Sequence, residues 1–473
     1  MNAPRAALLI DFGSTYTKLR AVDLDARRLL GTGQGPSTVT TDITRGLYAA
    51  LGDLEARLSG LPRFRYRLAS SSAAGGLRMV TVGLVRELTA EAARRAALGA
   101  GAKLVGTFAY RLTTTDVQRI AELRPDILLL AGGTDGGNSA VILDNARMLG
   151  RSVVDCPIVY AGNRAAADEA RTLLATKQVI VTENVMPEFN ALNIEPARAA
   201  IRKVFIDRIV HAKGIDRARC EVDAVLMPTP VAVMEGARLL ADGHGAMPGL
   251  GELLVVDPGG ATTDVHSVAV GTPRDGAVSH GLPEPRVKRT VEGDLGMRHN
   301  VSTIADAAGI EKLAARAATT PDRLLAILDG IARDVERLPQ SADEAAVDRA
   351  LAFSAVDIAV TRHCGTVETV YTPTGPVTVQ HGKDLTGIAT VIGTGGVIAA
   401  ARDPASILRA AMADPARPFA LKPRSPRLLL DRHYLLYACG LLATVEPEVA
   451  LDVALAHLKP LTEEYADERA RSA

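Results

Sequence analysis

The sequence lacks the residues on which several classes of binding protein depend. Tryptophan is absent and aromatic residues make up only 3% of the chain, which argues against a platform that stacks the bases of single-stranded nucleic acid. Lysine plus arginine and aspartate plus glutamate both number 54, so no net charge attracts nucleic acid or an anionic membrane. The composition therefore predicts no nucleic-acid partner and no membrane partner.

Long apolar runs and clustered cysteines are also missing. No apolar stretch approaches the roughly 18 residues of a membrane span, and the N-terminal apolar run ends at Asp11, too early for a signal peptide. The cysteines lie far apart, without a Cys-x-x-Cys pair: Cys156, Cys220, Cys364 and Cys439. Such cysteines are typical of buried thiols in a reducing compartment. We expect a soluble, cytoplasmic protein.

A P-loop is excluded, because the pattern Gly-x-x-x-x-Gly-Lys-Ser/Thr does not occur. The chain instead carries one hairpin pattern twice. Residues 254–264 read as a buried strand, a turn with an aspartate and two glycines, and a polar Thr-Thr-Asp run; residues 8–18 repeat this pattern. Alignment pairs Asp11 with Asp257, Gly13 with Gly259, Ser14 with Gly260 and Thr17 with Thr263. At 473 residues the chain is long enough for two domains. The repeat predicts two similar lobes that face one another.

The chemistry of the two turns favours a phosphate ligand. Glycine permits positive φ and has no Cβ, so successive backbone amides can approach an anion and form a concave site for it. We expect the phosphates to meet Gly13, Gly259 and Gly260. Further cofactor-binding donors come from Ser14, Thr15, Thr17, Lys18, Thr262 and Thr263.

The aspartate at the end of each strand suggests a metal ion. A carboxylate would repel a phosphate directly, whereas Mg²⁺ keeps several waters and binds through one or two carboxylates plus substrate phosphates. We therefore expect Asp11 and Asp257 to orient a hydrated Mg²⁺ on a polyphosphate, one from each lobe. The alternative is that each is an ordinary turn aspartate in a tight hairpin. The matching second copy favours the metal site.

A third element fits the same ligand. Residues 385–392 are strand-like and lead into a Gly-Thr-Gly-Gly turn before an apolar helical run, an arrangement in which Gly393, Gly395 and Gly396 permit close packing on a base or ribose. The six-residue dinucleotide fingerprint is incomplete here. A buried strand at 126–131 ends in a similar turn at 132–138, and we expect it to be the counterpart in the first lobe.

Two phosphate hairpins and a late Gly-x-Gly-Gly turn resemble the actin, Hsp70 and sugar-kinase ATPase superfamily. The resemblance extends from Asp11 to at least Gly396. It implies an α/β fold in which two ribonuclease-H-like lobes close over Mg-ATP. Residues 1–185 would form the first lobe and 186–250 connecting helices and a linker. The second lobe would span 251–400, with a helical insert at about 301–364, followed by a helical tail at 401–473.

Within this superfamily the sequence is similar to the MutL-type accessory proteins of glutamate (methylaspartate) mutase, which are unrelated to mismatch repair. The stretches that carry the likeness are residues 10–18, 130–137, 182–187 and 290–297. The resemblance implies a chaperone-like reactivating factor whose partners are the subunits of an adenosylcobalamin-dependent mutase. Lobe closure and opening driven by ATP would release damaged cofactor. The Asp-x-His-x-x-Gly pattern of a cobalamin-binding subunit is absent.

Two carboxylates and a serine turn are further candidates. Glu292 and Asp294 are the best candidates to position a hydrolytic water, since phosphoryl transfer needs a group that orients the nucleophile. The alternative is a Gly-Asp turn that caps the next helix. The turn at residues 70–76 either touches a partner or effector or is a flexible hairpin turn.

Three other functions compete with an accessory ATPase. A small-molecule kinase of the same fold needs a carboxylate base aimed at a substrate hydroxyl, and no such base stands out. An ATP-dependent electron-transfer activator needs cysteines that share an iron–sulfur cluster, and no cysteine follows a glycine turn. An actin-like filament is the third alternative. The leading expectation is an ATPase that acts as an accessory protein rather than as a metabolic enzyme.

Overall fold

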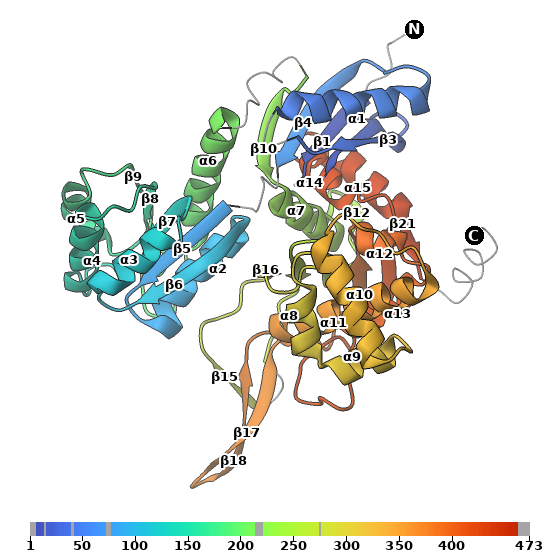
Figure 1. The fold of residues 1–473 in the computed structure, drawn as a ribbon. Helices are drawn as coiled ribbons and strands as arrows, with labels where there is room; N and C mark the ends of the chain where they lie inside the picture. Colours follow the sequence, from blue (N-terminus) through green and yellow to red (C-terminus); the bar gives the residue numbers. More distant parts are fainter. Residues whose placement is uncertain are drawn as a thin grey trace. The chain divides into compact units, whose positions relative to one another are not determined.

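The computed structural model describes residues 6–13, 16–38, 42–71, 77–212, 221–273 and 276–461 (Figure 1). The chain divides into two compact units, each described below by itself. The first comprises Met1–Ala232 with Gly281–Pro283, and the second Val233–His280 with Glu284–Ala473. The main boundary lies inside helix α7 (Thr229–Asp242), which therefore contributes residues to both units.

The first unit contains a five-stranded mixed sheet in the order β3-β2-β1-β4-β10. Its strands are β1 (Ala6–Phe12), β2 (Tyr16–Asp23), β3 (Arg28–Pro36), β4 (Phe64–Ser71) and β10 (Ala224–Pro228). The first three strands form an antiparallel meander, and β4 and β10 run parallel to β1. This order is that of a ribonuclease-H-like lobe. Every side chain of β1 is buried, as expected for the central strand of a covered sheet.

Helix α1 (Ile43–Leu58) packs closely on this sheet. It begins where the Asp42 side chain accepts a hydrogen bond from the Thr44 amide and so caps the helix. Its close approach depends on small residues of the strand beneath it. A Cβ on Gly33 of β3 would lie 2.4 Å from the Ala50 carbonyl oxygen of the helix.

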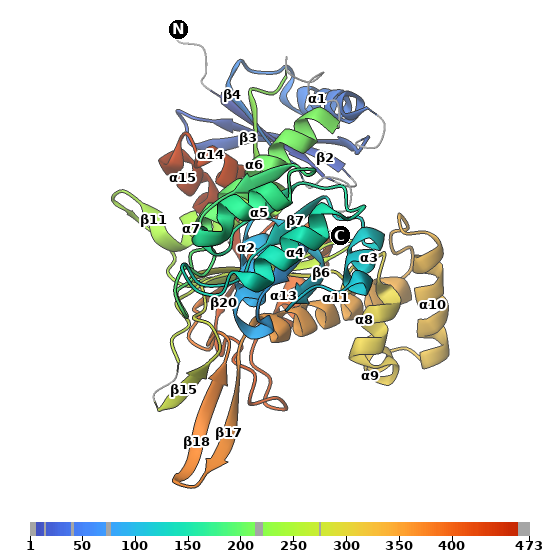
Figure 2. The same ribbon diagram turned by 90° about the vertical axis from the view of Figure 1, so that its left-hand side faces the viewer.

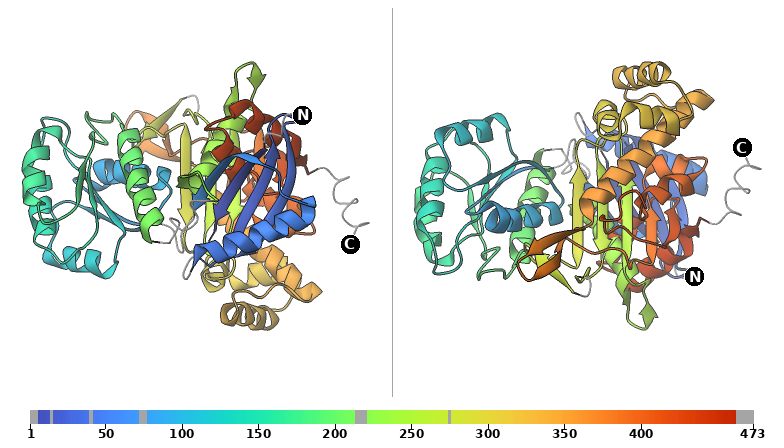
Figure 3. Two further views of the ribbon diagram at one scale, coloured as in Figure 1. Left: turned by 90° about the horizontal axis from the view of Figure 1, so that it is seen from above. Right: turned by 90° about the horizontal axis from the view of Figure 1, so that it is seen from below.

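A second sheet interrupts this lobe between β4 and β10. Its strands are all parallel, in the order β6-β5-β7-β8-β9. They are β5 (Leu77–Gly83), β6 (Ala102–Ala109), β7 (Ile127–Leu130), β8 (Ile158–Tyr160) and β9 (Val179–Val181). The helices are α2 (Glu91–Gly99), α3 (Thr114–Glu122), α4 (Ala140–Gly150), α5 (Ala167–Leu173) and α6 (Glu195–Ala212). Figures 2 and 3 show the helices on both sides of this sheet.

The inserted sheet differs from two sequence-based expectations. Residues 1–185 were expected to form one lobe, whereas residues 77–181 form this separate sheet, and β10 joins the first lobe from well beyond residue 185. The glycine turn after β7 was expected to be the counterpart of the Gly393 turn, and this is wrong. The strand in the equivalent position of the first lobe is β4, which ends at Ser71. Sequence patterns mark strands, but only pairing assigns them to a sheet.

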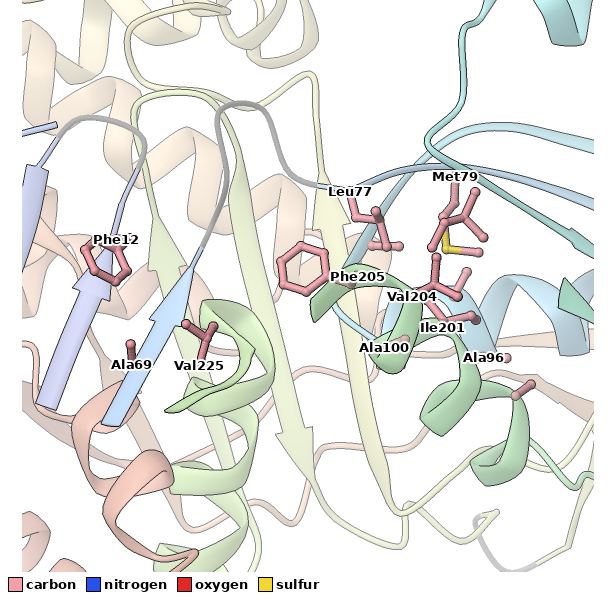
Figure 4. Close-up of a cluster of buried hydrophobic side chains, with 14 of the residues drawn as sticks. Phe12, Ala69, Leu77, Met79, Ala96, Ala100, Ile201, Val204, Phe205 and Val225 are labelled. Atoms are coloured by element: carbon pink, nitrogen blue, oxygen red, sulfur yellow. The ribbon is translucent and has the colours of Figure 1, made fainter. Parts of the chain in front are cut away.

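Helix α6 shows how the insert is held together. Its side chains Ile201, Val204 and Phe205 are buried with Leu77 and Met79 of β5 in one hydrophobic cluster (Figure 4). The same cluster includes small residues of α2, which let the two helices lie close together. Helix α6, which lies in the range expected to connect the lobes, is therefore part of the insert.

The second unit repeats the topology of the first lobe. Its sheet has the order β16-β14-β13-β19-β20-β21. The strands are β13 (Leu253–Pro258), β14 (Thr263–Val268), β16 (Val287–Glu292), β19 (Thr390–Gly393), β20 (Arg427–Asp431) and β21 (Leu458–Pro460). Three strands form an antiparallel meander, and two further strands run parallel to the central one. The predicted α/β fold with two ribonuclease-H-like lobes is confirmed.

The helices between β16 and β19 occupy the range expected for a helical insert. They are α8 (Val301–Ala308), α9 (Ile310–Arg316), α10 (Pro321–Arg333) and α11 (Ala342–His363). The long helix α11 belongs to the core of the lobe, because its residues Leu351, Val356 and Val360 are buried in one cluster with strand residues Leu254 and Val265.

The region expected to be a helical tail instead supplies strands β20 and β21 to the sheet. The helices of this region are α13 (Pro404–Leu408), α14 (Leu436–Leu442) and α15 (Pro447–His457), and α12 (Gly396–Ala400) directly precedes it. The strand Arg427–Asp431 is short and follows several prolines, so its pattern resembled a connecting segment.

Two small sheets complete the second unit. The strands β11 (Gly243–His244) and β12 (Met247–Pro248) form a hairpin where a linker was expected. The strands β15 (Ala277–His280), β17 (Thr366–Thr372) and β18 (Gly375–His381) form a sheet whose β17–β18 hairpin projects from the rest of the unit (Figure 2). Within the described ranges, no helix is long and apolar enough to cross a membrane. Cys156, Cys364 and Cys439 are buried free thiols, as predicted, and Cys220 lies outside the described residues.

Candidate functional site

The two predicted hairpins have the same geometry. In the first, the Gly13 amide donates to the Tyr16 carbonyl oxygen at 3.1 Å, and in the second the Gly259 amide donates to the Thr262 carbonyl oxygen at 2.8 Å. The strand registers also match, since Asp11 lies opposite Lys18 just as Asp257 lies opposite Asp264. Three of the pairs in the sequence alignment therefore occupy equivalent positions in the two lobes: Asp11 and Asp257, Gly13 and Gly259, and Thr17 and Thr263.

Asp11 is a buried carboxylate in a polar environment. Only 2% of its surface is exposed, and the Thr229 hydroxyl donates to its Oδ1 at 2.5 Å. Thr229 begins α7, and its hydroxyl oxygen also lies 3.3 Å from the Ser70 hydroxyl oxygen, within hydrogen-bonding distance. Burial raises the pKa of Asp11, and nearby Lys18 and the Thr229 hydrogen bond partly oppose this shift. The carboxylate thus carries a desolvation cost that a bound cation would relieve.

The other predicted residues of the first hairpin occupy different positions. Ser14 and Thr15 lie outside the described residues. Thr17 is fully buried, and a Cβ on Gly46 of α1 would lie 3.2 Å from its hydroxyl oxygen, so its side chain faces that helix. A Cβ on Gly13 would lie 2.5 Å from the Tyr16 carbonyl oxygen, so only glycine fits this tight turn.

Asp257 lies directly beside the late glycine turn. A Cβ on Gly395 would come within 2.1 Å of the Asp257 Oδ1, and the φ of Gly395 is +86°. The backbone there requires glycine for both reasons. The neighbouring Thr394 amide donates to the Val256 carbonyl oxygen at 3.0 Å, which ties the turn to the strand that carries Asp257. The structure thus brings together two elements more than 130 residues apart in the sequence.

The other two glycines of this turn have separate environments. A Cβ on Gly393 would meet the Leu408 side chain at 2.8 Å, so this glycine serves packing within the lobe. A Cβ on Gly396 would meet nothing within 4 Å. Of the three predicted glycines, Gly395 is the one that contacts the candidate metal-binding carboxylate.

Within the second hairpin, Gly260 is open, whereas a Cβ on Gly259 would lie 3.1 Å from the Thr262 carbonyl oxygen, and the threonines are engaged. A Cβ on Gly260 would have no neighbour nearer than 3.8 Å, which leaves space above the turn. The Thr263 hydroxyl is buried and donates to the Leu295 carbonyl oxygen at 2.7 Å. The Thr262 hydroxyl donates to Asp264 at 3.0 Å. These hydroxyls hold the hairpin, and the amides of the turn are the better candidates for phosphate contact.

Glu292 and Asp294 are both bound by one arginine of α11. Arg362 donates from Nη1 to Glu292 at 2.7 Å and to Asp294 at 2.8 Å. This hydrogen bond holds the pKa of Asp294 below its usual range. Glu292 pairs with Thr263 across strands β16 and β14, so it lies next to the second hairpin. The structure therefore places the pair near the turn but neutralised by Arg362.

Thr229 and Asp431 are site residues that sequence reasoning missed. Thr229 directly follows β10, the fifth strand of the first lobe, and Asp431 is the last residue of β20, the fifth strand of the second lobe. Each side chain contacts the end of the fourth strand of its own lobe. Thr229 reaches Ser70, and Asp431 accepts from the Thr394 hydroxyl at 2.9 Å. A short apolar run that ends in a polar residue before a helix, as in residues 224–229, is the signal that could have indicated this position.

A cavity of about 190 Å³ lies next to the second hairpin, between α10 and α11. Its apolar wall includes Ile327, Ile331 and Leu338, and its charged lining includes Arg298. The Arg298 amide donates to the Gly260 carbonyl oxygen at 2.9 Å, while its side chain forms an ion pair with Asp348 at 2.6 Å. One residue thus links the cavity to the turn.

The donor set fits a magnesium ion held through water better than a direct protein cage. The described ranges contain no cluster of three or more histidine, cysteine, aspartate or glutamate side chains that could hold a metal. Each hairpin supplies one carboxylate at the end of its first strand, Asp11 or Asp257, and Asp11 is buried. One or two carboxylates, with water and phosphate completing the shell, is the coordination that Mg²⁺ prefers.

Comparison with solved structures returns proteins with weak overall similarity. The chain is 10% identical to xylulose kinase from Bifidobacterium adolescentis, with 99% of each chain covered and a TM-score of 0.31. It is 9% identical to gluconate kinase from Lactobacillus acidophilus, with 99% and 96% covered and a TM-score of 0.35. TM-scores this low do not establish a shared fold. The fold assignment therefore rests on the strand order of the two lobes.

Comparison of sequences gives a clear result. The family model described as "MutL protein" matches residues 7–458. The chain is 46% identical over 457 residues to Protein MutL from Clostridium tetanomorphum, which covers 96% of this chain and 99% of that protein. The chain therefore belongs to the MutL protein family, which confirms the resemblance of its sequence to the glutamate mutase accessory proteins of that name.

Proposed function

We propose that this protein is an ATP-binding accessory factor that reactivates an adenosylcobalamin-dependent mutase such as glutamate mutase. Family membership supports the accessory role. The observation that carries the ATP-binding part is the matched pair of hairpins, each with an aspartate at the strand end and an amide-lined turn. A tight turn of amides beside one carboxylate suits a phosphate chain that carries a hydrated Mg²⁺.

Each lobe carries its own set of candidate ligand-binding residues. In the first, Asp11 is oriented by the Thr229 hydroxyl, and Lys18 on the neighbouring strand offers a cation for phosphate oxygens. In the second, the turn at Gly259 and Gly260 offers amides, and Gly395 leaves room beside Asp257. The Mg²⁺ ion of Mg-ATP would supply the positive charge that offsets the desolvation cost of the buried Asp11 carboxylate. The residues named above would bind and orient the nucleotide.

The cavity beside the second hairpin is the proposed place for the nucleoside. Its apolar wall suits a base, and Arg298 connects it through the main chain to the turn at Gly260. The boundary of the two units inside α7, where Thr229 contacts Asp11, gives a covalent route from the nucleotide site to the connecting helix. We propose that lobe closure driven by Mg-ATP acts on the mutase through this connection.

A small-molecule kinase is the second candidate, and the site favours it less. A kinase needs a carboxylate that can accept a proton from a substrate hydroxyl. The carboxylates nearest the second hairpin are engaged: Glu292 and Asp294 bind Arg362, and Asp264 binds Arg289 at 2.6 Å.

The decisive experiment measures phosphate release from Mg-ATP by the purified protein. It is run alone, with free adenosylcobalamin, and with glutamate mutase that has been inactivated by turnover. We expect the inactivated mutase to stimulate release and to recover activity in the same mixture. An Asp11→Ala variant is the control and should do neither. ATP binding without any response to the mutase would refute the accessory role, and transfer of phosphate to a small metabolite would favour the kinase.

A further inference from the structure

The second hairpin places two aspartates side by side. Asp257 of β13 and Asp264 of β14 are directly opposite each other in an antiparallel pair. Residues in such a pair have Cα atoms about 4.5–5.5 Å apart and side chains on the same face of the sheet. Two carboxylates this close repel each other unless a cation or a proton balances one of them. The first hairpin avoids this repulsion, because Lys18 lies opposite Asp11.

Arg289 supplies the balancing charge from the third strand of the sheet. It lies on β16 opposite His266, and therefore on the face of β14 that also carries Asp264, two residues earlier. Its Nε and Nη2 donate to Asp264 Oδ1 at 2.9 Å and 2.6 Å. Only 3% of the Arg289 side chain is exposed. Because a guanidinium does not lose its proton in proteins, this buried positive charge is permanent.

The duplication of the hairpin shows that the cation has moved to a different strand. The alignment of the two hairpins places Lys18 at the position of Asp264 and Arg20 at the position of His266. Burial raises the pKa of Asp11, and both of these cations oppose that shift. His266 cannot take this part, because burial lowers its pKa to about 4 and leaves it neutral at pH 7. In the second lobe, Arg289 carries the charge instead.

Both carboxylate oxygens of Asp264 are engaged. Oδ1 accepts from Arg289, and Oδ2 accepts from the Thr262 hydroxyl at 3.0 Å. A divalent cation could bind Asp264 directly only by displacing one of these donors, and displacing Arg289 would leave a buried charge without its counterion. Asp257 has a different neighbour, since it lies beside Gly395, which has no side chain to obstruct it. The two aspartates are therefore not equivalent as metal ligands.

We propose that Arg289 is a positioning residue of the second hairpin, which holds Asp264 so that Asp257 is the carboxylate of this pair that takes part in the magnesium shell. The inference rests on the proposed function, because it assumes that Asp257 orients a hydrated Mg²⁺. A hairpin with two available carboxylates would bind a divalent cation directly, without a nucleotide. Arg289 therefore makes metal binding at this hairpin depend on the phosphates.

The first test measures the binding of Mn²⁺ to the full-length protein without nucleotide, by electron paramagnetic resonance. Arg289→Gln keeps a hydrogen-bond donor but removes the charge, so Asp264 becomes available beside Asp257. We expect this variant to bind Mn²⁺ at least tenfold more tightly than the wild type. Arg289→Lys keeps the charge and should stay within twofold of the wild type. Unchanged Mn²⁺ affinity in Arg289→Gln would overturn the proposal.

Two further variants show whether the gain comes from Asp264. Combining Arg289→Gln with Asp264→Asn should return the Mn²⁺ affinity to within twofold of the wild type. Arg417→Gln is the control for lost positive charge, because Arg417 forms an ion pair with Asp357 at 2.5 Å elsewhere in the same unit. It should also stay within twofold. An equal gain in Arg417→Gln, or a gain that survives Asp264→Asn, would contradict the role of Arg289. Circular dichroism checks the fold of each variant.

The second test leaves Arg289 intact and does not depend on the folding of its variants. It compares the Mg-ATP affinity of Asp257→Asn and Asp264→Asn by calorimetry. We expect the first substitution to weaken binding more than about 100-fold, and the second to weaken it no more than threefold. Equal losses would overturn the inference and leave the proposed function standing. No loss in either variant would refute the metal role of Asp257 and the inference with it.

Discussion

The two lobes accept additional chain at different points of the same topology. In the first, the doubly wound domain enters between the fourth and fifth strands, β4 and β10. In the second, the helices α8 to α11 and the β17–β18 hairpin enter between the third and fourth strands, β16 and β19. The β-hairpin that joins the first two strands is left intact in both lobes. The insertions differ between the lobes, whereas the hairpin between the first two strands is free of insertions in both.

The hairpins themselves differ in the charge that faces each aspartate. Lys18 lies opposite Asp11, whereas Asp264 lies opposite Asp257 and is bound by Arg289. The first hairpin therefore offers its own cation, while the second keeps its extra carboxylate neutralised.

The largest expected effect comes from removing either aspartate. We expect Asp11→Ala and Asp257→Ala each to lower Mg-ATP affinity by more than about 100-fold, because each removes a carboxylate of the proposed magnesium shell. Calorimetric titration with Mg-ATP measures this, and circular dichroism checks the fold. A loss in only one variant would break the equivalence of the two hairpins.

A paired glycine substitution sharpens the role of the second lobe. Gly395→Val should lower Mg-ATP affinity by roughly 100-fold, since its Cβ would displace the Asp257 carboxylate, and a displacement of about 1 Å in a site can cost that much. Gly396→Ala is the control, because a Cβ there meets nothing within 4 Å. Nucleotide titration of both variants tests the contact. Similar losses in the two would show that the turn as a whole matters, and not its approach to Asp257.

The hydroxyl that orients Asp11 should have a smaller effect. Thr229→Val removes the hydrogen bond to the Asp11 carboxylate, so we expect the free energy of unfolding to fall by about 1–3 kcal/mol, the usual range for a buried polar group left unpaired. Nucleotide affinity should fall several-fold. Thr229→Ser keeps the hydroxyl and should remain near wild type in chemical denaturation and titration. If serine and valine behave alike, the hydroxyl does not position Asp11.

The raised pKa of Asp11 predicts that removing its charge stabilises the folded protein, by an amount that depends on pH. A folded-state pKa above the unfolded value means that the folded protein binds the proton more tightly, so stability falls as pH rises through the folded pKa. Asp11→Asn removes this charge and should stabilise the nucleotide-free protein at pH 7. The gain should shrink as the pH falls below the folded pKa. Thermal melts at several pH values measure it, and a variant less stable at pH 7 would contradict the prediction.

The smallest expected effect concerns Arg362. Arg362→Gln should lower stability by at most about 1 kcal/mol at neutral pH, because the ion pairs with Glu292 and Asp294 are partly exposed. Since Arg362 depresses the pKa of Asp294, its contribution is present above the unfolded pKa and lost as pH falls through the folded pKa. Denaturation at pH 7 and in acid tests this. If either carboxylate positions the hydrolytic water, phosphate release should also change in this variant.

The hairpin sites were predictable because their signal is local. A strand, an aspartate and a glycine turn lie within eleven consecutive residues, and the second copy removes the ambiguity of a single match. Thr229 and Asp431 were not predictable in this way, because each reaches the site from a strand that joins its sheet across an insertion or a long excursion. Their polar side chains have no distinctive neighbours in the sequence.

The sequence by itself determined the duplicated hairpin, the α/β class and the family, since each depends on short-range patterns that survive without knowledge of the fold. Only the tertiary structure decided that residues 77–181 form a separate sheet, that β20 is a sheet strand, and that Gly395 touches Asp257. The physical reason is that strand pairing and burial depend on contacts between residues far apart in the chain. A buried apolar run is compatible with several sheets until its hydrogen-bonding partner is known.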